Sequence, residues 1–290
     1  MNSAIILLDK KPGLTSFDTL RDIKRSLGTR KVGHTGTLDK FASGLLVVLA
    51  GRALKLSRWF SLCDKKYQGR LHFGIETNTL DPEGDVIAEA PLPSRENVEK
   101  ALSQFTGEIM QAPPEYSAIS VNGQRASDLA RKGKPPEMKK RPVSIHKIDL
   151  LSWEPPFADI FVHCSSGTYI RSLARDIALS AGSRAHLCSL VRTQVGGFSL
   201  DDADGSLRPV NKVTISALGL PHFEITPPEG EKIIQGKPLE PLLKDKSLFF
   251  EQKDLPNDGQ DITAAVFSEE TLVAVVEKTG GSWKYACVLG

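Results

Sequence analysis

The chain has 290 residues, of which 40% are hydrophobic and 25% charged, as in a typical globular protein with a sizeable core. Its four cysteines lie far apart and form no C-x-x-C motif, which argues against a disulfide framework or a zinc site and fits a reducing cytosol. The first apolar run, residues 4–8, is too short for a signal sequence or a membrane span. We therefore expect a cytoplasmic protein without membrane contact.

Positive charge is concentrated in two blocks, although the net charge of the whole chain is only +2. Residues 1–66 carry a net charge of +8, and residues 119–150 carry +5. A single block of this kind could be an ordinary solvated face. Two blocks in one chain favour a polyanionic partner over a small neutral substrate.

The first third of the chain predicts a strand, a helix and a second strand. Residues 4–8 predict a short buried strand, and an amphipathic helix is expected to begin at Thr15-Ser16 and end at Gly28. The glycines of Gly33-His34-Thr35-Gly36 favour a turn, and the apolar run 45–50 favours a buried strand. The apolar residues expected near one face of the helix are Phe17, Leu20, Ile23 and Leu27.

The middle of the chain continues this irregular mixture. Residues 66–73 alternate, with Tyr67, Leu71 and Phe73 expected on one face of a strand. Ser94 is expected to cap a helix that ends at Gly107, and residues 159–164 and 171–181 predict a strand followed by a helix. Because no regular βαβ repeat emerges, we predict an α+β fold rather than a doubly wound parallel sheet.

The C-terminal part predicts a separate small module. Residues 201–230 are rich in Asp, Gly and Pro, and we place a boundary near residue 220. The sequence from Lys232 onward favours short strands joined by turns, including residues 271–277 and 283–289. About 70 residues is close to the lower limit for an independent core.

Common catalytic motifs are missing from the sequence. It contains no Walker A motif, no G-x-S-x-G and no H-E-x-x-H. The segment Asp81–Asp85 resembles the start of a calcium loop, but Val86 stands where that loop needs glycine and Leu92 where it needs glutamate. We interpret this segment as an acidic surface turn and expect no bound metal.

Four polar or aromatic features have both a structural and a functional interpretation. The Gly33–Gly36 segment, with its basic neighbours, could be a simple turn or a backbone clamp like that of KH domains. Asp39 could form a turn, and Tyr67 could be a core tyrosine. Arg171 lies at the expected start of a helix, the end that disfavours positive charge, so we expect it to pair with a buried carboxylate.

Several motifs occur together, in a fixed order. The longest is Gly33-His34-Thr35-Gly36-Thr37-Leu38-Asp39, which continues to Gly44-Leu45-Leu46. The others include Lys66-Tyr67, Thr77-x-Thr79-x-Asp81, Pro113-Pro114-x-Tyr116-Ser117-Ala118, Gly167-Thr168-Tyr169-Ile170-Arg171 and Ala185-His186-Leu187. This ordered set resembles the TruB family of tRNA pseudouridine synthases over about residues 4–195, and residues 234–239 resemble its PUA-type module more loosely. Lys11 and Lys40 depart from the family, which commonly has proline near those positions.

The resemblance implies a fold and an activity. It implies a pseudouridine-synthase fold, with a mixed, largely antiparallel central sheet flanked by helices. The catalytic domain would span residues 1–220, with an RNA-gripping thumb at about 119–145, and a PUA-like module would span 221–290. The family isomerises uridine to pseudouridine at position 55 in the T-loop of tRNA, without a cofactor or metal.

The resemblance also implies roles for individual residues. Asp39 would be the catalytic carboxylate, acting as a nucleophile at uracil C6 or ribose C1′, or as a base after glycosidic cleavage. Arg171 would be its partner, and Tyr67 would stack on the base and is a candidate for removing the C5 proton. Other substrate-binding residues would be His34, which fills space left by flipped nucleotides, and Tyr169 and Leu190, which line the uracil pocket. Phosphate contacts would come from Arg125, Arg131, Lys132, Lys134, Lys139, Lys140 and Arg141.

Two alternative functions remain. One is a tRNA-binding or tRNA-folding chaperone, in which catalysis is secondary. The other is a guide-RNA-dependent pseudouridine synthase. The compact length and the lack of extended basic tails favour a stand-alone bacterial type that is monomeric and needs no protein partner.

Overall fold

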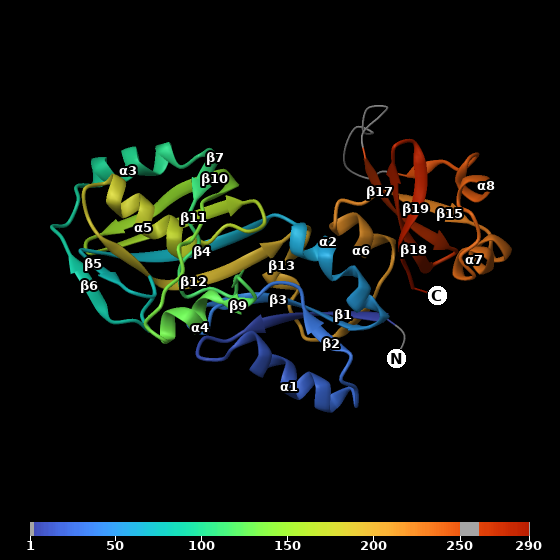
Figure 1. Ribbon diagram of the computed structural model, residues 1–290, viewed down its shortest axis with the longest axis horizontal. Helices are drawn as coiled ribbons and strands as arrows, with labels where there is room; N and C mark the ends of the chain where they lie inside the picture. Colours follow the sequence, from blue (N-terminus) through green and yellow to red (C-terminus); the bar gives the residue numbers. More distant parts are fainter. Residues whose placement is uncertain (1–2, 250–260, 290) are drawn as a thin grey trace.

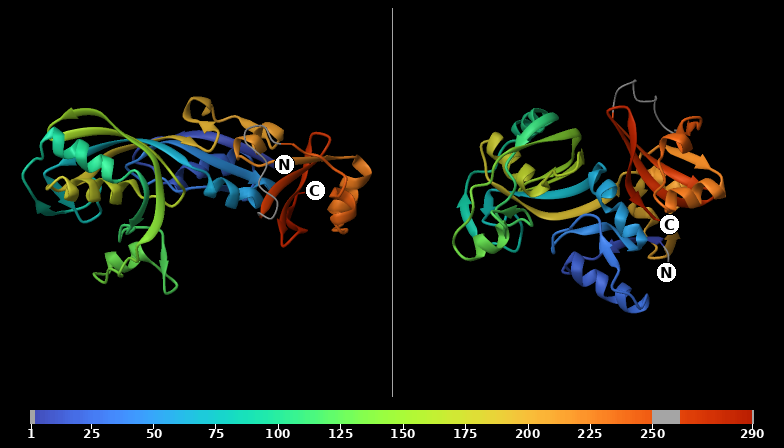
Figure 2. Two further views of the ribbon diagram at one scale, coloured as in Figure 1. Left: turned by 90° about the horizontal axis from the view of Figure 1, so that it is seen from above. Right: turned by 45° about the vertical axis from the view of Figure 1, so that its right-hand side comes forward.

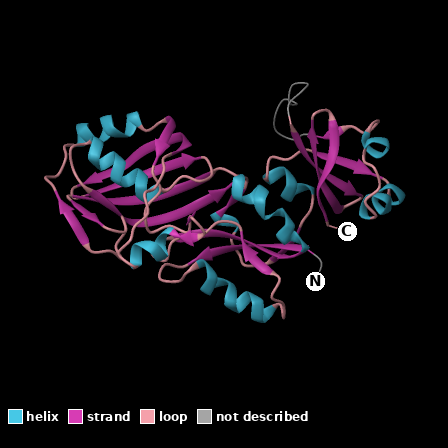
Figure 3. Ribbon diagram, in the orientation of Figure 1, coloured by secondary structure: helices cyan, strands magenta, loops and turns pink. Residues whose placement is uncertain are grey.

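The computed structural model describes residues 3–249 and 261–289. The molecule has two unequal parts, and strands dominate both: a larger part built on one long sheet and a smaller C-terminal part (Figures 1 and 3). No helix within these residues is long and apolar enough to cross a membrane.

The larger part is built on one long sheet. Its strand order is β14-β1-β3-β12-β4-β11-β10-β7, with β2 attached to β3 and β13 attached to β12. Every neighbouring pair is antiparallel except β3 and β12, which run parallel. The predicted mixed, largely antiparallel sheet is therefore confirmed. The strands are β1 (Ser3–Lys10), β2 (Val32–His34), β3 (Ser43–Gly51), β4 (Lys65–Phe73), β7 (Gly107–Gln111), β10 (Arg141–Glu154), β11 (Phe157–Cys164), β12 (Ala185–Val195), β13 (Phe198–Ser199) and β14 (Leu207–Pro209).

Helices α3 (Arg95–Gln104) and α5 (Ile170–Ser180) pack on one face of this sheet. The alternation of β4 puts Tyr67, Leu71 and Phe73 on that face, where they share a core with Leu173 and Ile177 of α5. Ser94 caps α3, as expected, by accepting a hydrogen bond from the backbone N–H of Asn97. The sheet and these two helices form the framework from which the candidate site is built.

Helix α1 (Ser16–Ser26) begins at the expected place, because Thr15 and Asp18 form a reciprocal capping box. Phe17, which was expected near the apolar face of this helix, is 67% exposed, and its ring lies beneath the ammonium group of Lys24. Leu20 is the buried apolar residue of the helix and packs against β1 and β3.

Shorter elements connect these parts. They are η1 (Arg52–Leu56), α2 (Ser57–Leu62), β5 (Ile75–Thr77), β6 (Val86–Glu89), β8 (Ser120–Val121), β9 (Gln124–Arg125), α4 (Ala126–Arg131), η2 (Leu200–Asp202) and α6 (Lys212–Ala217). The hairpin β8–β9 and helix α4 project away from the body of the molecule (Figure 2, left). This projection falls within residues 119–145, the segment that the sequence assigns to a thumb.

The smaller part forms its own sheet after residue 221, in the order β16-β15-β17-β18-β19. Its strands are β15 (His222–Ile225), β16 (Leu248–Phe249), β17 (Ile262–Ser268), β18 (Thr271–Thr279) and β19 (Ser282–Val288), and its helices are α7 (Pro227–Ile234) and α8 (Glu240–Leu243). The expectation of strands from Lys232 onward was wrong at its start, since residues 232–234 are helical. Thr226 and Glu229 form a capping box at the start of α7, and two prolines occupy the first turn of this helix.

The two parts share a hydrophobic core. Phe267 and Leu289 of the smaller part belong to the same buried cluster as Leu7, Leu56 and Phe60 of the larger part. Polar contacts reinforce this interface, because the guanidinium of Arg52 donates to the carbonyl of Leu289 at 3.0 Å. The C-terminal module is therefore packed against the larger part rather than tethered to it.

Candidate active site

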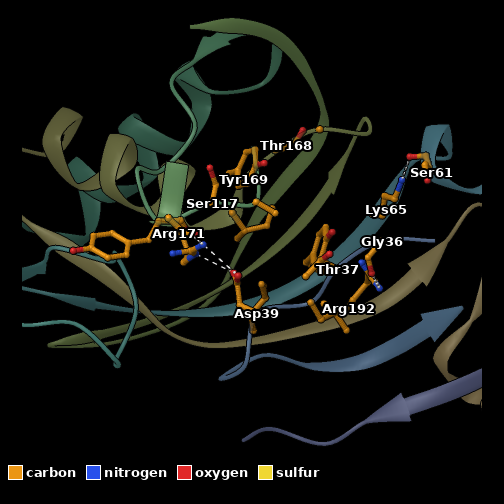
Figure 4. A pocket seen from close by; sticks show the side chains of 18 of the residues that line it. Gly36, Thr37, Asp39, Ser61, Lys65, Ser117, Thr168, Tyr169, Arg171 and Arg192 are labelled. Atoms are coloured by element: carbon orange, nitrogen blue, oxygen red, sulfur yellow. Dashed lines mark hydrogen bonds and ion pairs between the residues drawn. The ribbon is translucent and has the colours of Figure 1, made fainter. Parts of the chain in front are cut away.

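A cavity of about 480 Å³ opens beside the sheet where several separate segments converge. Its walls come from the loop before β3, the start of β4, residues 116–118, the turn before α5, β12 and the projecting segment of β9 and α4. Figure 4 shows Asp39 and Arg171 facing each other within it. The sequence-predicted residues that line it are Asp39, Tyr67, Tyr169, Arg171, Leu190, Arg125 and Arg131.

The loop that carries Asp39 leaves the sheet between β2 and β3. Gly33 and His34 are part of β2, paired with Leu49 and Val48, so the turn predicted at Gly33–Gly36 is limited to a bend at Thr35 and Gly36. The excursion begins at Thr35, and Ser16 fixes its far side, because its hydroxyl bonds both the N–H and the C=O of Leu38. Asp39 therefore lies on a short loop with fixed ends.

Lys10 and Gly44 also hold this loop in place. The Lys10 side chain is fully buried, and its ammonium donates to the carbonyls of Leu14 at 2.6 Å and of Lys40, next to Asp39, at 3.5 Å. Gly44 has φ +97°, and a Cβ atom there would lie 2.4 Å from the Arg192 carbonyl oxygen. Only glycine fits this close approach of β3 to β12.

Lys40, which departs from the family pattern, has a simple surface contact. Its exposed ammonium lies 3.6 Å from the carboxylate of Glu83, and its carbonyl accepts a hydrogen bond from Gly13. An exposed ion pair of this kind contributes little stability. Neither Lys40 nor Glu83 lines the cavity, so this contact leaves the side chains of the cavity unaffected.

Arg171 connects Asp39 to the rest of the site. It is the second residue of α5 and only 4% exposed. Its Nε lies 2.9 Å from Asp39 Oδ2 as an ion pair that is not aligned as a hydrogen bond, and its Nη2 donates to Asp39 Oδ1 at 3.2 Å. The expectation that this cation pairs with a carboxylate is confirmed.

A second carboxylate, Asp81, anchors the same guanidinium. Its Oδ2 lies 3.1 Å from Arg171 Nη1, while its Oδ1 accepts from the Thr79 hydroxyl and the Glu83 N–H. The remaining donors of Arg171 reach the carbonyls of Thr79 at 2.6 Å and Tyr116 at 2.9 Å. A guanidinium held at so many points cannot turn away from Asp39.

The prediction of an acidic surface turn at 81–85 was therefore wrong at its first residue. Asp81 is only 5% exposed, whereas Asp85 is exposed as expected. The ligand spacing of a calcium loop carries no information about the distant Arg171, which is the partner of Asp81. The signal that could have found it is the Thr77-x-Thr79-x-Asp81 pattern, whose hydroxyls bond Asp81.

The surroundings of Asp39 have opposing effects on the pKa of its carboxyl group. Its burial raises its pKa above the ordinary value of 3.8, and the Arg171 guanidinium opposes this rise. The negative charge of Asp81 raises the pKa further. The side chain nevertheless keeps 38% of its surface exposed to the cavity, so a bound substrate can reach it.

Tyr67 and Arg192 also line the cavity. Tyr67 is 8% exposed, and its burial raises its pKa above 10, an effect that the Arg192 guanidinium opposes. Arg192 is 3% exposed and donates to the carbonyls of Leu45 at 2.8 Å and Gly36 at 3.0 Å. Sequence reasoning missed Arg192, because a single arginine in an apolar strand has no pattern around it.

Tyr169 occupies the position before α5 and lines the cavity (Figure 4). The side chain of Gln111 fixes its backbone by accepting from its N–H and donating to its C=O. Burial raises the pKa of its phenol. His34 lies elsewhere, in β2 and outside the lining of the cavity, with its Nδ1 buried and lacking a hydrogen-bond partner.

The predicted phosphate-binding residues lie on or next to the projecting segment. Arg125 and Arg131 reach the cavity, and Arg131 also approaches Asp128 of its own helix at 3.6 Å. All seven side chains are exposed, namely Arg125, Arg131, Lys132, Lys134, Lys139, Lys140 and Arg141. Two of these exposed basic side chains, Arg125 and Arg131, thus line the Asp39 cavity.

Relatives of known name resemble the chain along its whole length. The tRNA pseudouridine synthase B of Borreliella burgdorferi is 38% identical over 99% of this chain and all of its own. The protein of the same name from Corynebacterium efficiens is 41% identical over 83% of this chain and 85% of its own.

Solved structures resemble the fold. A chain of the crystal structure of a Cbf5-Nop10-Gar1 complex superposes with a TM-score of 0.72 at 23% identity, covering 99% of this chain and 85% of that one. The archaeal box H/ACA sRNP Nop10-Cbf5 complex gives a TM-score of 0.70 at 22% identity. The family profile described as TruB family pseudouridylate synthase, N-terminal domain, matches residues 24–170. This chain therefore belongs to the TruB family of pseudouridylate synthases.

Proposed function

We propose that this enzyme isomerises uridine to pseudouridine at position 55, in the T-loop of tRNA. The observation that carries the proposal is the Asp39 carboxylate, which Arg171 holds at the wall of a cavity that the exposed Arg125 and Arg131 also line. The relatives named tRNA pseudouridine synthase B support the substrate. In the reaction the N-glycosidic bond breaks, the uracil turns, and a bond forms between its C5 and ribose C1′.

The target uridine has to leave the stacked loop before it can react. Base-modifying enzymes reach a stacked base by flipping it into a pocket. A cavity of about 480 Å³ is within the range that holds small ligands, and its lining combines aromatic and polar side chains. Tyr67, Tyr169 and Leu190 supply its flat or apolar surfaces, and we propose that they enclose the uracil.

Asp39 supplies the reactive oxygen. Attack at uracil C6, attack at ribose C1′ and proton removal after cleavage all require the ionised form of the carboxylate. A bound base excludes water, which raises the carboxyl pKa, while the fixed guanidinium of Arg171 keeps favouring the anion. Arg171 therefore both orients Asp39 and maintains its charge.

Tyr67 is suited first to stacking. Its raised pKa keeps the phenol protonated near neutral pH in the free enzyme. Removal of the C5 proton by Tyr67 requires the phenolate, which the neighbouring Arg192 guanidinium favours. We propose that His34, in β2, occupies space that flipped nucleotides vacate.

RNA binding would involve both parts of the molecule. We propose that residues 1–220 form the catalytic domain, that its thumb at about 119–145 contacts the T-arm phosphates, and that residues 221–290 act as a PUA-like RNA-binding module. The exposed arginines and lysines of the thumb supply the positive charge that phosphate contacts need. We also propose that the enzyme works as a monomer without a protein partner.

The direct test uses a bare T-arm stem-loop and the purified full-length chain. Pseudouridine should form at the position equivalent to 55 without guide RNA or added proteins. A stem-loop with cytidine at that position is the matched control and should bind without reacting. Turnover that appears only after a guide RNA or a second protein is added would overturn the stand-alone mechanism.

A further inference from the structure

Two histidines and one aspartate meet on the face of the sheet opposite the Asp39 cavity. Asp64 Oδ2 lies 3.1 Å from His146 Nε2 and 3.9 Å from His163 Nε2. One potential ligand atom from each side chain lies within 4.8 Å of the other two. Within residues 3–249 and 261–289, these three form the only such group of His, Cys, Asp and Glu side chains.

The sheet itself explains why these side chains converge. They come from three adjacent strands or strand ends, since β11 pairs with both β10 and β4 (Figure 1). His163 is opposite Lys66 in the β4–β11 register, and Asp64 precedes Lys66 by two residues, so both face the same side. Their neighbours Lys65 and Cys164 face the other side and are buried.

A β-bulge brings in the third side chain. The β10–β11 register shifts between Ile145 and Lys147, which leaves His146 as the extra residue. Ile145 stays in the core, so the bulge directs His146 outward, beside His163, with ring centroids 4.8 Å apart. Bulges often redirect a side chain in this way at functional positions.

We propose that Asp64, His146 and His163 form a binding site for a divalent transition-metal ion of the zinc type. Two imidazoles and one carboxylate are a common ligand set for zinc, and they leave a fourth position open. Tetrahedral coordination needs ligand atoms about 3.3 Å apart, so small side-chain movements would suffice. The three side chains are 31–47% exposed, which gives a hydrated ion access.

The ligand set also selects among metals. Mg²⁺ and Ca²⁺ prefer several oxygen ligands, and this group offers only one carboxylate. Lys66, on the same face, adds a positive charge that disfavours a cation held by charge alone. Imidazole ligands suit zinc, cobalt, nickel and copper instead.

The test measures metal binding directly and does not depend on the proposed function. Untagged full-length protein is titrated with Co²⁺, whose visible absorption reports coordination, and with Zn²⁺ by calorimetry. We expect one ion per chain, and at least about tenfold weaker binding in each of the variants Asp64→Asn, His146→Gln and His163→Gln. Zn²⁺ should raise the melting temperature of the unmodified protein but not that of the His146→Gln/His163→Gln double variant.

His72→Gln is the matched control. His72 lies near His186 on the same sheet, with ring centroids 5.1 Å apart, but this pair is not part of a three-ligand group. Its removal should leave metal binding unchanged. Binding weaker than about a millimolar dissociation constant would overturn the proposal, as would stoichiometric binding that survives the double variant.

Discussion

At the scale of single residues, the site depends on how Arg171 is anchored. Its guanidinium bridges Asp39, which is open to the cavity, and Asp81, which is buried. A buried ion pair adds little net stability, but removal of one partner leaves an uncompensated charge. Asp81 is therefore a positioning residue whose replacement should affect folding as well as catalysis.

Replacement of Asp81 by alanine should destabilise the fold by about 1–3 kcal/mol, because Arg171 would keep Asp39 as a counter-ion but lose the buried acceptor of its Nη1 donor. Urea unfolding followed by circular dichroism measures the free energy of unfolding. Asp85→Ala is the control from the same loop and should change stability by less than about 0.5 kcal/mol, because Asp85 is exposed. Equal stability of the two variants would contradict the anchoring role.

The pKa of Asp39 predicts the acid limb of the pH–rate profile. Asp39 must be ionised to react, and burial raises its pKa above the ordinary value of 3.8. As the pH is lowered, the single-turnover rate should therefore begin to fall before the pH reaches 3.8. The Asp81→Asn substitution removes a negative charge beside Asp39, which favours the ionised form of Asp39. The acid limb of the pH–rate profile should therefore move to lower pH in this variant. A limb that stays in place in this variant would argue against Asp39 as the titrating group.

The sequence predicted part of this site and missed part of it. The unfavourable position of Arg171 at a helix start predicted a carboxylate partner, because electrostatics at a helix end is a local property. Asp81 and Arg192 were not found as parts of the site, since their importance comes from contacts between residues 90 and 156 positions apart in the chain. Such contacts are set by the tertiary fold: the Thr77-x-Thr79-x-Asp81 pattern marks Asp81 but not its distant partner, and Arg192 has no pattern around it.

At the scale of elements, we propose that the thumb, residues 119–145, links the cavity to a large substrate. Its hairpin and helix project from the sheet, and its basic side chains are exposed (Figure 2). Phosphate contacts release counterions, so the affinity of the enzyme for tRNA should fall steeply with salt.

Replacement of Lys139 and Lys140 by alanine should weaken tRNA binding and make its salt dependence shallower. The slope of log affinity against log salt should become shallower by about 0.9 for each phosphate that the variant no longer neutralises. Fluorescence anisotropy over a series of salt concentrations measures this slope. Lys100→Ala, on α3 and outside the thumb, is the control, and an equal effect of this variant would contradict a specific role for the thumb.

Most elements were predictable because their signals are local. Alternation in β4 and the Ser94 cap of α3 depend only on neighbouring residues, and both are present in the structure. Helix α7 was not predicted, because the consecutive β-branched residues Ile233 and Ile234 favour a strand. The capping box of Thr226 and Glu229, with its following prolines, was the stronger local signal.

At the scale of the whole molecule, the two parts are joined by a shared core rather than by a flexible linker. The length of the C-terminal part, near the limit for an independent core, fits this arrangement. Which apolar residues face the larger part could not be predicted, because the sequence shows only that they are apolar.

Phe267→Ala tests this shared core. The ring is fully buried between the two parts, so its removal should destabilise the protein by about 3–5 kcal/mol. Phe249→Ala is the control, because that ring is 46% exposed and should contribute much less. Urea midpoints measure the difference, and similar midpoints for the two variants would contradict a shared core.

The central claim is that the Asp39 carboxylate isomerises uridine in tRNA. The most direct measurement compares single-turnover pseudouridine formation by the unmodified enzyme and by Asp39→Asn on full-length tRNA, with tRNA affinity measured in parallel. We expect the variant to bind tRNA normally while its rate falls by at least about 10⁴-fold, as is typical when a central catalytic group is removed. Turnover near that of the unmodified enzyme would contradict this claim.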